Sequence, residues 1–100
     1  MKMYILVRDS IPLGFAMTAV AHAAAIGMKK WVNDPAFIAW NETSFKKVIC
    51  KVHDDEFNAA MSHDDGIALT ESALNDDYTA AVFKPRKEWP KAFKFFRLYK

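Results

Sequence analysis

The chain has 100 residues, of which 52% are hydrophobic and 26% are charged, and its formal net charge is +2. This length allows one hydrophobic core over residues 1–100 and excludes a second domain, while the hydrophobic content excludes a disordered chain. The single cysteine, Cys50, excludes an internal disulfide and a zinc site built on thiolates, and the apolar run around it predicts a core residue rather than a nucleophile.

The first half of the chain predicts two strands separated by two helices. A run that is apolar on both faces predicts a central strand, and an alanine-rich stretch predicts a helix that packs closely against a sheet. Pro12 favours a helix start soon after it, and Gly27 predicts the end of that helix. Pro35 predicts the first turn of a shorter helix. The four elements are expected over residues 3–8, 15–28, 35–40 and 45–52.

The second half predicts a helix followed by three strands. Three acidic residues crowd the expected first turn of the helix, where the helix dipole favours negative charge, and Gly66 is expected to end it. Pro85 ends the strongest of the strands. The expected elements are a helix over residues 54–63, strands over 67–69, 78–83 and 95–99, and one helical turn over 88–92.

This order of elements predicts an α/β fold. The opening strand–helix–strand unit favours parallel pairing, and the short later connections favour antiparallel neighbours. We expect a three-layer α/β/α sandwich with a mixed sheet of four to five strands. The uncharged stretch over residues 11–28 contains Pro12 and His22 and is mostly alanine, so it predicts a buried helix rather than a membrane span. With no secretory signal evident, we expect a cytoplasmic protein with no membrane partner.

Several stretches, taken in chain order, resemble one known family. Residues 17–23 read Met-Thr-Ala-Val-Ala-His-Ala within the first helix, and Trp40 stands near the end of the second. Lysines flank the second strand, residues 78–85 read Tyr-Thr-Ala-Ala-Val-Phe-Lys-Pro, and residues 96–99 read Phe-Arg-Leu-Tyr. This order is similar to the type II peptidyl-tRNA hydrolase family. The resemblance implies that family's fold, cleavage of the ester of peptidyl-tRNA, and tRNA as a partner.

The chain departs from that family at the positions that carry its chemistry. Leu13 and Phe15 stand where the family has two loop lysines, and Ala19 stands where it has a helix glutamine. Residues 70–75 are shorter than the family's Asp-Ala-Gly-x-Thr segment and lack its glycine, although Glu71 stands near the position of the aspartate. The resemblance therefore implies a hydrolase-like site without its cations.

Ester hydrolysis needs a positioned water, a base, and a donor or cation for the developing oxyanion. His22, Glu71 and Thr70 are the candidate catalytic residues that replace the missing lysine. Alternatively, His22 is a helix histidine whose ring bonds to the backbone beneath the sheet, and Glu71 is a surface residue of a loop. Asp9 follows the first strand, where α/β sheets place ligands, but its position also suits a turn or a helix cap.

We expect no metal and no cofactor. His53 and His63 flank the acidic helix, and each has a carboxylate within two residues. Clusters this short and local are more typical of solvated side chains than of metal ligands.

The basic tail is the second candidate site. It mixes cations with an aromatic ring, a combination that holds RNA through phosphate contacts and base stacking. The candidate RNA-binding residues are Lys84, Arg86, Lys87 and Trp89. Alternatively, the tail is a solvated loop with Trp89 in the core. Residues 53–77 carry eight Asp or Glu and no Lys or Arg, so the tail cations either contact phosphate or offset this acidic segment.

Two functions follow from these patterns. The first is a divergent peptidyl-tRNA hydrolase. The second is a non-catalytic binding module of the same fold that forms a homodimer, because a core this small gains stability from a dimer. Leu13 and Phe15 favour the second, because an apolar loop at a former polar site suggests an apolar ligand or a protein contact. Residues 11–14, Ile-Pro-Leu-Gly, also resemble another group with this fold whose function is unknown.

Overall fold

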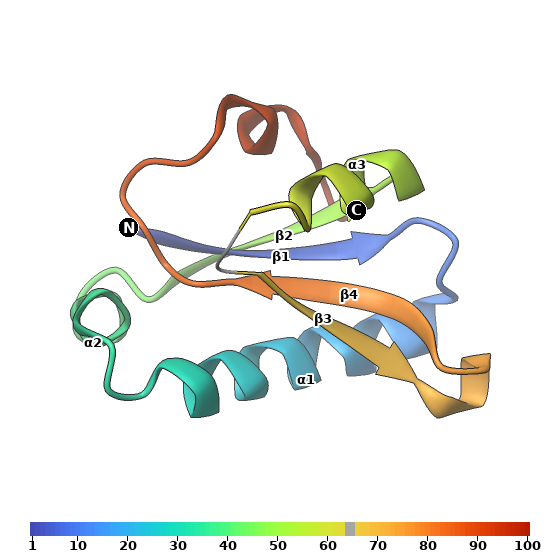
Figure 1. The fold of residues 1–100 in the computed structure, drawn as a ribbon, viewed down its shortest axis with the longest axis horizontal. Helices are drawn as coiled ribbons and strands as arrows, with labels where there is room; N and C mark the ends of the chain where they lie inside the picture. Colours follow the sequence, from blue (N-terminus) through green and yellow to red (C-terminus); the bar gives the residue numbers. More distant parts are fainter. Residues whose placement is uncertain (64–65) are drawn as a thin grey trace.

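A computed structural model describes residues 1–63 and 66–100 (Figure 1). The strands are β1 (Lys2–Arg8), β2 (Lys46–Val52), β3 (Gly66–Glu71), β4 (Asp77–Phe83) and β5 (Arg97–Leu98). The α-helices are α1 (Leu13–Trp31), α2 (Pro35–Glu42) and α3 (Asp54–Ala60), and two 3-10 helices are η1 (Ser72–Leu74) and η2 (Lys91–Phe95).

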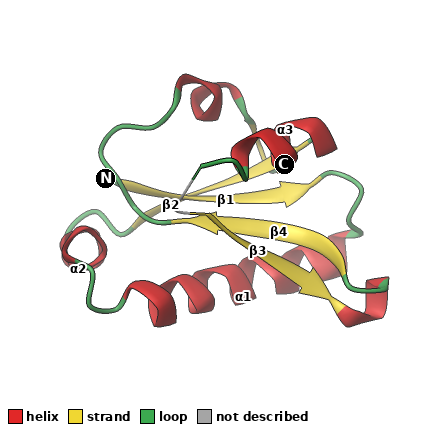
Figure 2. Ribbon diagram, viewed as in Figure 1, coloured by secondary structure: helices red, strands yellow, loops and turns green. Residues whose placement is uncertain are grey.

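The strands form one mixed sheet in the order β3-β4-β1-β2-β5. β1 pairs with β2 in parallel, and the other neighbours are antiparallel. α1 and α2 cover one face of the sheet, while α3 and η2 cover the other (Figure 2). The predicted three-layer α/β sandwich with a mixed sheet is confirmed. None of the helices among the described residues is long and apolar enough to cross a membrane.

β1 is the centre of the sheet and is buried on both faces, as its apolar run predicts. Tyr4 and Leu6 belong to the core beneath α3 and η2, and Met3 and Ile5 belong to the core beneath α1 and α2. Cys50 is 1% exposed and lies in the first of these cores, so its prediction as a core residue is confirmed.

Gly27 does not end the first helix, because α1 continues to Trp31. Gly27 is buried, and a Cβ atom at this position would lie 3.1 Å from Cζ3 of Trp31. The glycine therefore makes room for the indole, and the prediction of a helix end was wrong because this contact depends on how Trp31 folds back on the helix.

Three further boundaries differ from prediction. α3 ends at Ala60 rather than at residue 63, and Gly66 begins β3 instead of ending the helix. The helical turn lies at Lys91–Phe95 instead of residues 88–92, because Pro90 precedes it as the N-cap. Because Phe95 belongs to η2, the last predicted strand is shortened, and its residues Arg97 and Leu98 pair with β2.

Candidate functional site

The three predicted catalytic residues lie together. His22 is on α1, while Thr70 and Glu71 are the last two residues of β3. All three line one notch between α1 and the β3–β4 pair, and Phe15 lines it with them. His22 is exposed, so its ring is not held beneath the sheet, and that alternative interpretation was wrong.

The notch is nearly closed. Its free volume is about 10 Å³, which is room for one water molecule at most. Phe15 packs against the core formed by residues of β1, α1 and β4, so its ring is part of the wall. The Thr79 hydroxyl donates to the Leu69 carbonyl at 3.3 Å, and the Thr18 hydroxyl donates to the Gly14 carbonyl at 3.3 Å. Two of the three threonine hydroxyls at the notch therefore already have backbone acceptors.

The described residues of the notch offer no cation for a developing oxyanion. None of the described residues that line it is Lys or Arg. His22 or Glu71 could accept a proton from water there, but only hydroxyl groups are at hand to stabilise an oxyanion. The arrangement thus holds candidate bases without an electrostatic partner and without space for an ester.

Lys84, one of the predicted RNA-binding residues, forms an ion pair within the fold. Its Nζ lies 3.1 Å from Oδ2 of Asp34, the N-cap of α2. Asp34 also accepts hydrogen bonds from the backbone N–H groups of Ala36 and Phe37. The bond from Lys84 lowers the pKa of Asp34, so Lys84 ties β4 to α2 and holds this carboxylate ionised.

Trp89 is half-buried, which supports the interpretation that places it in the core. Its ring packs against those of Tyr4 and Phe93, with centroids 4.7 and 5.1 Å apart, so part of it belongs to the core. The Arg86 guanidinium lies over the same ring, 5.4 Å from its centroid. Trp89 and Lys87 also line a cavity of about 450 Å³.

That cavity is basic and aromatic. Its lining includes three lysines, Lys2, Lys87 and Lys94, with Glu88 as the one acidic member and with Tyr4 and Trp89 as aromatic members. The sequence pattern of the tail did not reveal Lys2 and Lys94. They reach the cavity because Lys2 exchanges backbone hydrogen bonds with Arg86 of 3.4 and 3.3 Å, and because η2 folds back over β1.

Acidic residues of the middle segment pair with Arg8 at the carboxyl end of β1. Arg8 Nε lies 2.9 Å from Asp54 Oδ1, and its Nη1 lies 2.8 Å from Asp77 Oδ1. The same guanidinium donates to the carbonyl of Tyr78. These bonds raise the pKa of Arg8 and lower that of Asp54, so part of the acidic segment is offset within the fold.

Asp9 and His53 meet at the ends of the two parallel strands. His53 Nδ1 lies 2.5 Å from Asp9 Oδ2, and Arg97 Nη2 lies 3.9 Å from the same oxygen. Asp9 is therefore a partner for the His53 imidazole and the Arg97 guanidinium and not only a turn residue. Within residues 1–63 and 66–100, no group of three His, Cys, Asp or Glu could hold a metal ion, and Asp64 and Asp65 lie outside the described residues.

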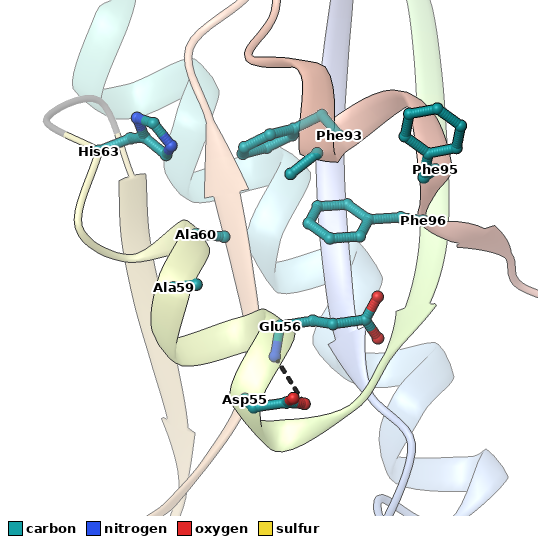
Figure 3. Close-up of a pocket in the computed structure, with 9 residues that line it drawn as sticks. Asp55, Glu56, Ala59, Ala60, His63, Phe93, Phe95 and Phe96 are labelled. Atoms are coloured by element: carbon teal, nitrogen blue, oxygen red, sulfur yellow. Dashed lines mark hydrogen bonds between the residues drawn. The ribbon is translucent and has the colours of Figure 1, made fainter.

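A third cavity, of about 350 Å³, lies between α3 and η2 (Figure 3). Phe93 and Phe96 form its wall, and His63 packs edge-on against Phe93 with ring centroids 5.7 Å apart. The carboxylates at its rim already form hydrogen bonds with the first turn of α3. Asp55 accepts a hydrogen bond from the backbone N–H of Glu56, and Glu56 accepts one from the backbone N–H of His53. We assign this cavity to the packing of α3 against η2.

Neither a comparison with models of known protein families nor a search of curated protein sequences finds a match for this chain.

Proposed function

We propose that the protein is a non-hydrolytic module that binds single-stranded RNA in the cavity of Lys2, Lys87, Lys94 and Trp89. The observation that supports this proposal is the meeting of three lysines and a half-buried indole around about 450 Å³ of space. Lysines attract the phosphates of a strand, and an aromatic ring gives a base a stacking surface worth about 1–3 kcal/mol. A tRNA end is one such strand. A cytoplasmic location suits both the RNA and a single unpaired thiol.

Titration with a short oligoribonucleotide over a series of salt concentrations tests this function. Each phosphate contact contributes about −0.7 to the slope of log affinity against log salt. Removing Lys87 and Lys94 together by K87A and K94A should therefore weaken binding by about tenfold or more and flatten the slope by about 1.4. Both residues are exposed, so both variants should keep the fold.

The matched control is the pair K29A and K30A, which removes the same charge from the last turn of α1. This control should bind RNA as the native protein does. Equal weakening in the two double variants would show that net charge alone attracts RNA, and the proposal would be wrong. Absence of binding at low salt would also reject it.

The hydrolase remains a second candidate because His22, Thr70 and Glu71 converge on one notch. Release of peptide from N-blocked aminoacyl-tRNA measures this activity directly. If the notch opens and acts, E71Q or H22A should reduce the rate by about 10²-fold, the usual scale for loss of a general base. A rate equal to that without protein would exclude this candidate.

The homodimer stays a prediction. Sedimentation equilibrium over a range of protein concentrations measures it.

A further inference from the structure

A second basic cavity, of about 430 Å³, lies at the β5 edge of the sheet. Lys51, Arg97, Leu98 and Lys100 line it. Lys51 and Arg97 are register partners in the β2–β5 pair, and like charges directly opposite each other destabilise a β-ladder. An anion between these two side chains would relieve the repulsion.

The protein itself offers this pair little negative charge. Arg97 Nη2 lies 3.9 Å from Oδ2 of Asp9, and Nδ1 of His53 lies 2.5 Å from the same oxygen. The Lys51 ammonium lies instead over the ring of Tyr99, 5.2 Å from its centroid. The cavity therefore keeps a positive lining of Lys51, Arg97 and Lys100, which the long contact from Asp9 to Arg97 offsets only in part.

An apolar groove of about 290 Å³ adjoins this cavity. Its lining consists of Leu13, Ala16, Met17, Val20, Ile49 and Tyr99. Leu13 is 63% exposed and Met17 is 67% exposed, although both face a concave surface that could cover apolar atoms. Removing apolar surface from water lowers the free energy, so binding of an apolar group in the groove would be favourable.

Tyr99 joins the groove to the basic cavity. It lines the groove, its backbone N–H donates to the Ile49 carbonyl at 2.9 Å, and its ring lies under the Lys51 ammonium. Ile49 and Lys51 are two residues apart on β2, so both side chains point to the same face of the sheet. An apolar surface and a positive charge are thus neighbours on one face.

We propose that the groove and the basic cavity form one binding site for an amphipathic anion, a small molecule with an apolar body and a carboxylate or phosphate head. The body would lie along Met17, Val20 and Ile49, and the head would contact Lys51 and Arg97. The two spaces together fall within the range of pockets that hold small ligands. This site is distinct from the RNA cavity and goes beyond the proposed function.

The positive charge of Lys51 and Arg97 favours a small anionic ligand as the occupant of this surface over a second copy of the chain. A symmetric dimer with its two-fold axis at the basic cavity would bring the cations of one Lys51–Arg97 pair close to those of the other. A strand of RNA would place polar phosphates beside Leu13 and Met17. An amphipathic anion alone matches both halves of the surface.

Isothermal titration with four probes tests the proposal: decanoate, decyl phosphate, decanol and inorganic phosphate. We expect decanoate or decyl phosphate to bind at least tenfold more tightly than both decanol and inorganic phosphate, and the better of the two identifies the head group. Equal binding of decanol would show that the cations play no part. Absence of binding by both amphiphiles would overturn the site.

Variants locate the site. The double variant K51Q/R97Q should weaken binding of the amphiphile at least tenfold, and M17D should weaken this binding to a similar extent. The controls are K30Q, which removes an exposed lysine at the far end of α1, and M28D, which changes an exposed methionine of the same helix. L13Q replaces M17D if circular dichroism shows that M17D does not fold. Equal effects of control and site variants would overturn the proposal, as would a dimer that M17D dissociates while no probe binds.

Discussion

At the scale of single residues, Gly66 and Gly14 differ in the space around them. A Cβ atom at Gly66 would lie 2.6 Å from Cε2 of Phe83, a residue that is 1% exposed in the core. A Cβ atom at Gly14 would meet nothing within 4 Å, because this glycine lies in the exposed first turn of α1. Gly66 therefore makes space for a buried ring, whereas the packing around Gly14 does not require a glycine.

We expect G66A to lower the free energy of unfolding by about 1–3 kcal/mol, because the added methyl group overpacks the core against Phe83. G14A should leave the stability unchanged or raise it by up to about 1 kcal/mol, because alanine is the better helix former. Urea denaturation of both variants measures the difference. The packing role of Gly66 would be refuted by a G66A variant as stable as G14A.

Phe15 and Cys50 show how residue type limits chemistry at this scale. Phe15 fills the wall of the notch where the resembled family has a lysine, so the position supplies packing instead of charge. Burial raises the pKa of the Cys50 thiol to about 11, which keeps it protonated and unreactive at neutral pH. Neither residue supports a nucleophilic or electrostatic role.

At the scale of elements, Arg8 joins three of them. It extends from the end of β1 to Asp54 at the start of α3 and to Asp77 at the start of β4. Its side chain is 15% exposed, whereas those of its two partners are 60% and 56% exposed. Water screens the carboxylates but not the guanidinium, so removal of Arg8 should matter more than removal of either partner.

This arrangement predicts a pH-dependent effect of R8M. The bond from Arg8 lowers the pKa of Asp54, so the folded state binds fewer protons than the unfolded state as the pH falls. That contribution is complete above the ordinary Asp value of 3.8 and is lost below it as the pH passes the lowered pKa. The stability difference between native protein and R8M should therefore be largest near neutral pH and shrink in acid.

Urea denaturation at a series of pH values measures this difference. K30M serves as the control, because it removes one positive charge from an exposed position of α1. A difference between native protein and R8M that stays constant down to low pH would contradict the role assigned to the Arg8–Asp54 pair.

At the scale of the whole molecule, the tail after β4 contacts first β1 and then β2. The tail after β4 bonds to Lys2 at the start of β1 and then crosses the face that also carries α3, before β5 pairs with β2 (Figure 1). This path places cations of the tail beside Lys2 in one cavity and beside Lys51 in another. Both proposed binding surfaces therefore depend on the tail.

The sequence by itself determined the types of element and the mixed sheet. Local periodicity identified the two-faced strand β1 and the alanine-rich helix α1, and connection lengths separated parallel from antiparallel neighbours. The resemblance also proposed His22, Thr70 and Glu71 as candidate catalytic residues, and all three line one notch.

Only the tertiary structure decided what these surfaces can do. The closure of the notch by Phe15, the approach of Lys2 to Lys87, and the position of Arg97 opposite Lys51 all join residues far apart in the chain. Their distances follow from strand register and from side-chain packing across the core, which no local pattern contains. The role of Gly66 was mispredicted for the same reason, since this glycine makes space for the ring of Phe83, whereas Gly27 makes room for Trp31 four residues further along the same helix.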